Sequence, residues 1–164
     1  MTLEAIKARP WTAFYTPDMK HEIEHAPFRT IGAMVAASAK LYADQYAFTA
    51  VMPNGMFGNL TYAEADRMSD AFAVYLREVA GLKTGDRVAL QVPNGLAFPI
   101  AAFGVFKAGC VLVNVNPLYT AEEMGRQFAD AKPAALVIVD MFADKLPEAL
   151  KAYHIPTVIV TRVA

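Results

Sequence analysis

The sequence predicts an α/β fold: part of a doubly wound, mostly parallel sheet with flanking helices, preceded by an irregular N-terminal arm and a small β-hairpin. Three observations predict it. Short apolar runs alternate with amphipathic stretches from residue 87 onward, which is the pattern of βαβ units. These runs are continuously apolar, as expected of strands that helices cover on both faces. Ahead of them, a turn signal separates two β-prone runs.

Residues 1–29 form the predicted arm, which has three prolines and four aromatic residues, Trp11, Phe14, Tyr15 and Phe28. Such a segment can hardly fold alone, so we expect it to drape over its own domain or over a partner. Within it, HEIEH (21–25) matches the H-E-x-x-H pattern of zinc proteases. Two flanking prolines leave room for barely two helical turns, and His154 is the only other histidine. We therefore interpret the stretch as a solvated, charged segment rather than a zinc site.

Two helices and a hairpin are expected next. Thr30 is the predicted N-cap of an amphipathic helix whose apolar face holds Ile31, Met34, Val35, Leu41 and Tyr42. The turn of the hairpin is expected at 53–55, where the sequence reads PNG. Thr61 and Glu64 have the spacing of a capping box and begin a longer helix that ends at Gly81. Its expected apolar face holds Met68, Phe72, Tyr75, Leu76 and Val79.

The remaining chain predicts the parallel sheet. Strands are expected at 87–92, 110–115, 134–140 and 157–163, with helices near 96–108, 120–131 and 146–153. Thr120 and Glu123 form a second predicted capping box. Residues 30–164 are therefore expected to form an incomplete α/β domain, about half of a nucleotide-type one.

Composition and charge exclude several classes of protein. A net charge of −1 and a pI near 6.3 predict no nucleic-acid partner. Cys110 is the only cysteine, so the chain can form no intramolecular disulfide, and a reducing, cytoplasmic setting is expected. Its apolar neighbours predict a buried thiol. The most apolar region, 96–113, is interrupted by Pro99, Lys107 and Gly109 and is not expected to span a membrane, although peripheral membrane contact stays open.

Candidate ligand-binding loops follow the predicted strands, because open α/β sheets bind ligands beyond the carboxyl ends of their strands. They are PNG (93–95), NPLYT (116–120) and Asp140. Neither a G-x-G-x-x-G nor a P-loop pattern occurs. Turn formation and helix capping explain these residues well. Glu122 and Glu123 suit the first turn of a helix, and no serine has the context of a nucleophile elbow. The residues alone thus predict no active site.

Residues 60–140 resemble the opening region of adenylate-forming enzymes, the superfamily of acyl-CoA synthetases, luciferases and peptide-synthetase adenylation domains. LTYAE (60–64) is similar to the first core motif of that family, and FKAGCVLVNVNP (106–117) to the second. The segment GDRVALQVPN and the later segment NVNPLYT resemble the corresponding sequences of bacterial long-chain fatty-acid–CoA ligases. The N-terminal arm is similar in kind to theirs.

The resemblance implies a two-step reaction. ATP and a fatty acid form an acyl-adenylate with release of pyrophosphate, and the thiol of CoA then displaces AMP, with Mg²⁺ neutralising phosphate charge. The family's phosphate loop, adenine-side motif, ribose-binding aspartate and C-terminal catalytic lysine have no counterpart in these 164 residues.

We therefore expect an N-terminal fragment that is inactive alone, binds no ATP, CoA or Mg²⁺, and leaves the fatty acid to the missing region. No catalytic, cofactor-binding or metal-binding residue is assigned in it. The resemblance implies at most that one loop shapes the floor beneath the substrate cleft, through Asn114, Asn116, Pro117 and Tyr119.

Two other functions are compatible with the sequence. A non-enzymatic module could act through self-association, because an unfinished sheet leaves strand edges and apolar faces uncovered. This alternative predicts a homodimer with the arm exchanged between copies. A sibling ligase acting on another carboxylic acid is the second alternative. The expected location is the cytoplasm, with peripheral contact at the inner membrane left open.

Overall fold

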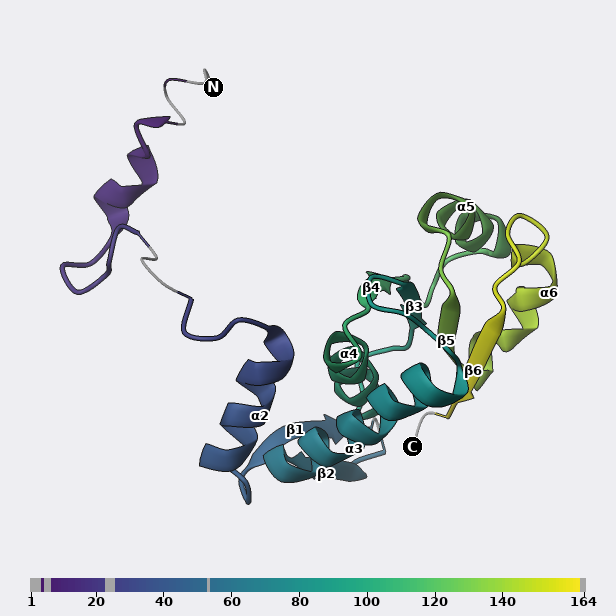
Figure 1. The fold of residues 1–164 in the computed structure, drawn as a ribbon, viewed down its shortest axis with the longest axis horizontal. Helices are drawn as coiled ribbons and strands as arrows, with labels where there is room; N and C mark the ends of the chain where they lie inside the picture. The colour runs from purple at the N-terminus through teal and green to yellow at the C-terminus, as the bar shows by residue number, and fades with distance from the viewer. Residues whose placement is uncertain (1–3, 5–6, 23–25, 53, 163–164) are drawn as a thin grey trace.

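The computed structural model describes residues 4, 7–22, 26–52 and 54–162. In the arm, the 3₁₀ helix η1 (Pro10–Phe14) lies apart from the rest of the molecule (Figure 1). Phe14 is 88% exposed. The described residues of the arm around η1 therefore do not drape over the domain, and packing on a partner stays a prediction. His25 lies outside the described residues, so the HEIEH interpretation is untested; Glu22 pairs with Arg9 at 2.5 Å.

The first helix of the body, α2 (Ile31–Leu41), begins where predicted. The Thr30 hydroxyl accepts a hydrogen bond from the Ala33 N–H at 3.0 Å. Only part of the expected apolar face of α2 is buried. The buried residues of the helix are Val35 and Ala39, whereas Leu41 is 71% exposed. The other members of that face, Ile31, Met34 and Tyr42, are 41–45% exposed. Small residues rather than large ones therefore turn toward the body.

The predicted hairpin is present as β1 (Tyr46–Val51) and β2 (Phe57–Thr61), paired antiparallel. The turn brings the Gly55 N–H to the Met52 carbonyl at 2.9 Å, and Gly55 has a φ of 83°. Residues without a side chain adopt this left-handed backbone at little cost, which explains the glycine. Pro53 itself lies outside the described residues.

The second helix, α3 (Tyr62–Val74), opens with the predicted capping box of Thr61 and Glu64. It continues into a π-helical turn, η2 (Tyr75–Val79), before Gly81 ends it with a φ of 69°. The predicted apolar face is wrong in part. Leu76 is fully buried, but Val79 is 71% exposed, and the other buried positions are small residues, Ala65, Ser69 and Ala73. Sequence hydrophobicity missed this face because small side chains contribute little to it.

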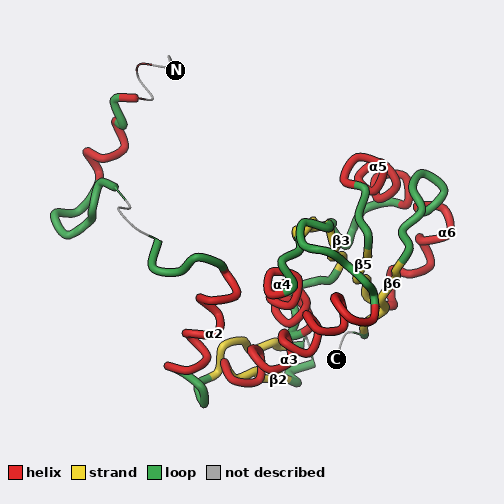
Figure 2. The backbone as a smooth tube through the Cα atoms, viewed as in Figure 1, coloured by secondary structure: helices red, strands yellow, loops and turns green. Residues whose placement is uncertain are grey.

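The four parallel strands of the main sheet are ordered β4-β3-β5-β6. All four are labelled in Figure 1, and Figure 2 shows β3, β5 and β6 among the surrounding helices. They are β3 (Arg87–Gln91), β4 (Val111–Asn114), β5 (Ala135–Val139) and β6 (Thr157–Thr161). The connecting helices are α4 (Ala97–Lys107) and α5 (Ala121–Ala131), followed by η3 (Asp140–Lys145) and the short α6 (Leu146–Ala149). The helix predicted at 146–153 therefore lasts a single turn. The α/β fold class is confirmed.

Successive residues of the central strands face two different cores. Val88 and Leu90 of β3 pack with α3 and α4, whereas Ala89 between them packs with α5 and α6. Strand β5 alternates in the same way. Helices thus cover both faces of the sheet, as Figure 1 shows, and the continuous apolar runs follow from this double burial. Cys110 is buried, as predicted, and burial raises the pKa of its thiol.

Candidate functional site at the carboxyl edge of the sheet

The strand order reverses around β3. β4 pairs with one side of β3 and β5 with the other, so that α4 and α5 cover opposite faces. Sheets of this kind open a crevice beyond the carboxyl ends of their strands at the point of reversal. The loop at 93–95 follows β3 and lies at this point. Concave surfaces flank it on two sides.

The first, which we call the loop cleft, measures about 670 Å³. It lies between the end of β3 and the β4–α5 loop, with Phe142 beyond β5 completing the wall. The structure brings together all four predicted cleft-floor residues in its lining, Asn114, Asn116, Pro117 and Tyr119. Their role beneath a substrate stays a prediction.

Three side chains donate hydrogen bonds to backbone carbonyls at the end of β4 and in the β4–α5 loop. Gln91 Nε2 donates to the Asn116 carbonyl at 3.3 Å, and Gln127 Nε2 donates to the Asn114 carbonyl at 2.9 Å. Lys145 Nζ donates to the Tyr119 carbonyl at 2.8 Å. The loop is thereby fixed from a strand, from α5 and from η3. Sequence reasoning missed these contacts, although one signal existed: Gln91 is a polar residue inside an apolar strand.

Gln91 is fully buried, and its Oε1 has no hydrogen-bond partner among the described residues. Burying an amide is costly unless its polar atoms are paired, so the unpaired Oε1 carries an energetic cost. Asn116 strengthens the same loop, because its Oδ1 accepts a hydrogen bond from the Leu118 N–H at 3.0 Å. The loop therefore has a defined shape before any ligand binds.

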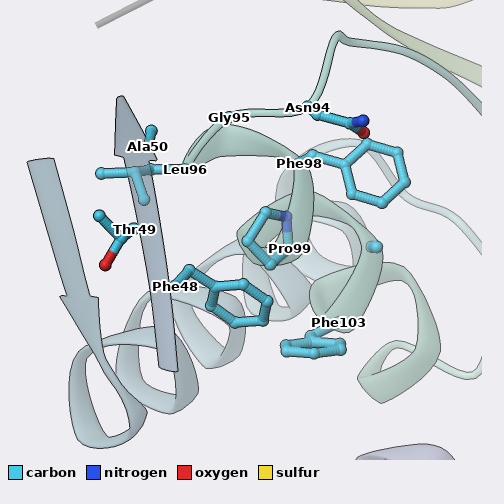
Figure 3. Close-up of a pocket in the computed structure, with 10 residues that line it drawn as sticks. Phe48, Thr49, Ala50, Asn94, Gly95, Leu96, Phe98, Pro99 and Phe103 are labelled. Atoms are coloured by element: carbon cyan, nitrogen blue, oxygen red, sulfur yellow. The ribbon is translucent and has the colours of Figure 1, made fainter. Parts of the chain in front are cut away.

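The second concave surface, the hairpin groove, lies between the β1–β2 hairpin and the start of α4 (Figure 3). It consists of two adjoining hollows of about 380 and 420 Å³ that share Ala50, Asn94 and Leu96 in their linings. The rings of Phe48 and Phe103 close one end with their centroids 6.0 Å apart. No sequence pattern had placed the hairpin at this edge.

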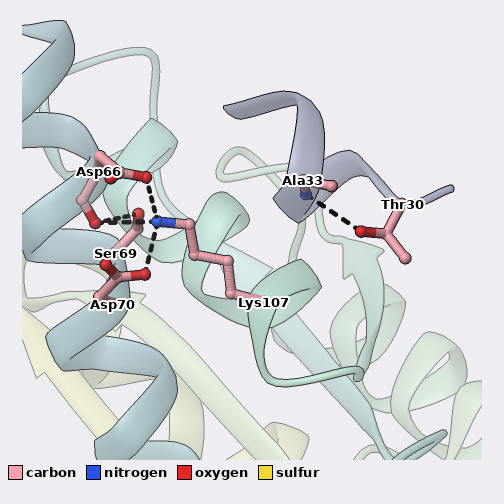
Figure 4. A network of polar contacts seen from close by, with 6 residues as sticks. All are labelled: Thr30, Ala33, Asp66, Ser69, Asp70 and Lys107. Carbon is pink, nitrogen blue, oxygen red and sulfur yellow. Dashed lines mark hydrogen bonds and ion pairs between the residues drawn. The ribbon is translucent and has the colours of Figure 1, made fainter. Parts of the chain in front are cut away.

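Lys107 ties together the helices behind the groove (Figure 4). Its ammonium group contacts carboxylate oxygens of Asp66 at 2.6 Å and Asp70 at 2.7 Å, and donates to the Asp66 carbonyl at 2.9 Å. Only 9% of its side chain is exposed. Because Lys107 ends α4 and both aspartates lie on α3, the ion pairs fix these helices to each other.

The electrostatics of the loop cleft are mild. Glu123 lies in the first turn of α5, where the backbone N–H of Thr120 and then its hydroxyl hold the pKa of the Glu123 carboxyl below its usual 4.5. The Asp140 carboxylate accepts a hydrogen bond from the adjacent Met141 N–H at 2.8 Å, but Asp140 is the first residue of η3 and not its N-cap, so the predicted capping role is wrong. Within the described part of the chain, no three His, Cys, Asp or Glu side chains are placed to hold a metal ion.

The residues of the loop cleft do not by themselves fit a magnesium nucleotide. The described lining has asparagine amides and a tyrosine but neither a lysine or arginine for phosphates nor a carboxylate for Mg²⁺. No catalytic step is therefore assigned to these side chains. What the cleft can do is offer a rigid backbone surface with amide donors and acceptors.

Comparison with known proteins identifies the family. The family model described as AMP-binding enzyme matches residues 35–163. The chain belongs to this family of AMP-binding enzymes. Over 152 residues it is 40% identical to the long-chain-fatty-acid–CoA ligase of Salmonella typhimurium, a match that covers 93% of the chain and 26% of that ligase. The chain thus spans about a quarter of the length of the curated relatives that it matches.

Other relatives show how wide the family is. The chain is 34% identical to a salicyl-AMP ligase of Mycobacterium tuberculosis over 113 residues, which are 69% of this chain and 20% of that ligase. Among solved structures, a fatty acyl CoA synthetase of Mycobacterium tuberculosis superposes with a TM-score of 0.68 at 26% identity. That match covers 80% of this chain and 26% of the solved chain. The chain is therefore similar to ligases that are named for different acids.

Proposed function

We propose that this chain is the N-terminal part of a synthetase that activates long-chain fatty acids with ATP and transfers the acyl group to CoA. The observation that carries the proposal is the 40% identity to a long-chain-fatty-acid–CoA ligase across 93% of the chain. In the first step a fatty-acid carboxylate oxygen attacks the α-phosphorus of ATP, giving acyl-AMP and pyrophosphate. In the second step the CoA sulfur attacks the acyl carbon, AMP leaves, and a thioester forms.

Within that enzyme, residues 30–164 would be the first part of an α/β domain and residues 1–29 its arm. The loop cleft would lie beneath the bound substrate, with Asn114, Asn116, Pro117 and Tyr119 as its floor. The hydrogen bonds from Gln91, Gln127 and Lys145 support this role, because they hold the loop in one shape. ATP, CoA and Mg²⁺ would be held by residues outside this chain.

The proposed substrate can be tested on the native protein. An antibody against the 164-residue chain would isolate the protein that carries it from the cells that make it, with the purified chain as size marker. We expect a much larger band, whose eluate forms acyl-CoA and AMP from palmitate but not from benzoate or salicylate. Thioester formation from an aryl acid alone would favour a sibling ligase. A band that migrates with the marker and no thioester from any acid would contradict the proposal.

A second candidate, self-association through the arm, is favoured by the exposed apolar residues of η1 and α2. Phe14 is 88% exposed and Leu41 is 71% exposed, and the arm lies apart from its own domain. We propose a homodimer in which each arm covers the α2 face of the other copy. Light scattering should give twice the monomer mass for the full chain and the monomer mass for residues 30–164. Equal masses for both proteins would contradict arm exchange.

The proposal also includes a location. A single cysteine suits the reducing cytoplasm, and a fatty-acid substrate would favour peripheral contact with the inner membrane. None of the described helices combines the length and apolar character that a membrane span needs. Fractionation of the cells with the same antibody tests both points, since a peripheral protein leaves the membrane fraction in high salt.

A further inference from the structure

We propose that Lys145 is a positioning residue that fixes the floor of the loop cleft to its wall. Its side chain is not part of the cleft lining, but its ammonium group contacts one lining residue on each side, Tyr119 and Phe142. The inference rests on the proposed function, in which the cleft lies beneath the acid that is activated. The sequence alone had given this lysine no role.

The first contact of Lys145 is with the floor. Its Nζ donates a hydrogen bond to the Tyr119 carbonyl at 2.8 Å, across 26 residues of the chain. Gln91 and Gln127 hold the same segment with neutral amide donors. Hydrogen bonds from a charged donor are about twice as strong as neutral ones. Lys145 therefore makes the strongest of the three contacts that hold the loop.

The second contact is with the wall. Lys145 Nζ lies 5.0 Å from the centroid of the Phe142 ring, within the range of a cation–π interaction. Both residues belong to η3, and residues three apart lie one above the other in a 3₁₀ helix. This spacing places the ammonium group over the ring. Phe142 in turn completes the wall of the cleft beyond β5.

Lys145 differs from the other two donors in where it comes from. Gln91 reaches the loop from β3 and Gln127 reaches it from α5, whereas Lys145 belongs to the element that carries the wall. No described carboxylate forms an ion pair with Lys145. Its charge therefore acts on the floor and the wall together, and losing it should release both.

The lining indicates which ligand this positioning affects. Apart from three asparagine amides and the Tyr119 hydroxyl, the described side chains of the cleft are apolar, and none is charged. Apolar walls of this kind suit hydrocarbon rather than phosphate groups. A displaced wall should therefore weaken binding of the acid and leave ATP unaffected.

Hydrogen exchange of the 164-residue chain tests the contact without any ligase activity. The reporter is the Tyr119 N–H, which donates to the Asn116 carbonyl at 3.1 Å. Lys145→Met keeps the apolar stem but removes the charge and the donor, so exchange at Tyr119 should become about five- to tenfold faster. The Val115 N–H, bonded to the Leu90 carbonyl at 3.0 Å, is the internal reference and should not change.

Lys151→Met is the matched control for this experiment. Lys151 is 70% exposed and pairs with Glu148 on the surface of α6, so its loss should leave exchange at Tyr119 unchanged. Lys145→Arg keeps the charge and the donors, and it should restore slow exchange at Tyr119.

In the native enzyme, Lys145→Met should separate KM from kcat. The substituted protein would be isolated with the same antibody and assayed with palmitate. The KM for palmitate should rise about five- to tenfold with kcat within about twofold of the parent, because a loosened wall weakens ground state and transition state alike. The KM for ATP should stay unchanged, and Lys145→Arg should restore the KM for palmitate.

A cycle of substitutions tests whether Lys145 acts through the wall. Phe142→Leu keeps an apolar side chain but removes the ring and therefore the cation–π interaction. In that background, the rise in KM caused by Lys145→Met should be about two- to fivefold smaller than in the parent. Equal effects in both backgrounds would mean that Lys145 does not act through Phe142.

Three further results would overturn the inference. The first is unchanged exchange at Tyr119 in Lys145→Met. The second is equal acceleration at Tyr119 and Val115, which would indicate a general loss of stability. The third is a decrease in kcat with an unchanged KM for palmitate. If the native protein forms no thioester from any acid, the proposed function fails, whereas the exchange experiment still decides whether Lys145 positions the loop.

Discussion

Lys107 is the residue at which helix packing depends on charge. Its ammonium group is almost buried between α3 and α4, whereas its partners Asp66 and Asp70 are 25% and 62% exposed in their side chains. Removing one member of a buried ion pair leaves the remaining charges without compensation. Partial exposure of the aspartates moderates that cost here.

Lys107→Ala should lower the free energy of unfolding by about 2–3 kcal/mol, somewhat less than for a fully buried pair. Lys151→Ala is a matched control, because the Lys151–Glu148 pair is 70% and 66% exposed. Lys151→Ala should lower the free energy of unfolding by less than about 1 kcal/mol. Urea denaturation of the three proteins measures both values, and equal effects of the two substitutions would contradict the role assigned to Lys107.

Gly104 permits the close approach of α4 to α3. A Cβ atom there would lie 2.6 Å from Cδ1 of Phe72 and 3.0 Å from the Ser69 carbonyl oxygen. One of these atoms belongs to the backbone, so the helices would have to move apart. Gly104→Ala should therefore destabilise the protein by about 1–3 kcal/mol, despite the better helix propensity of alanine.

Gly95→Ala is the control for this prediction, since its Cβ would meet nothing closer than 3.9 Å. Thermal melting should show a clear decrease in Tm for Gly104→Ala and almost none for Gly95→Ala. A tolerated alanine at Gly104 would mean that the α3–α4 contact adjusts more readily than its geometry indicates.

At the scale of the element, helices α3 and α5 both begin with a capping box. In each, a threonine hydroxyl accepts a hydrogen bond from the N–H three residues later, while the glutamate at that position accepts one from the threonine N–H. The threonine backbone N–H, followed by its hydroxyl, keeps the pKa values of Glu64 and Glu123 below the usual 4.5. Both boxes were visible in the sequence because their partners lie only three residues apart.

These two carboxylates should make the protein sensitive to acid. A pKa that is lower in the folded than in the unfolded state stabilises folding above the unfolded pKa, and this stabilisation is lost as pH falls through the folded pKa. Glu64→Gln and Glu123→Gln should therefore lower Tm at pH 7, and the difference from the parent should shrink as pH falls below 4.5. A Tm difference between variant and parent that stays constant from pH 7 to pH 3 would contradict this role of the two carboxylates.

At the scale of the whole molecule, the described chain has a double-sided core and a shaped carboxyl edge but no phosphate-binding cation in its loop cleft. It should therefore not exchange radiolabelled pyrophosphate into ATP in the presence of palmitate. The preparation must be free of other ligases, so a mock purification serves as the control. Exchange above this background would show that the residues needed for adenylation are present in the chain.

The sequence by itself determined the strands, most of the α-helices, their order and most of their ends, but not the 3₁₀ helices η1 and η3 or the π-helical turn η2. Thr61, Thr120 and Gly81 act within a few residues, and continuous apolar runs such as 134–139 report burial on both faces. The family was also readable from two local segments, 60–64 and 106–117. All of these signals are short in range.

Only the tertiary structure decided which faces meet and what the edge of the sheet holds. Ser69 is buried where α4 approaches α3 through Gly104, and Ala65 and Ala73 lie on the same helix as buried positions, whereas Val79, beyond α3 in the π-helical turn, is exposed. The contacts of Gln91 and Lys145 with the β4–α5 loop span 25 and 26 residues, and the hairpin groove joins segments still farther apart. Such contacts depend on packing and shape, which hydrophobic periodicity does not encode.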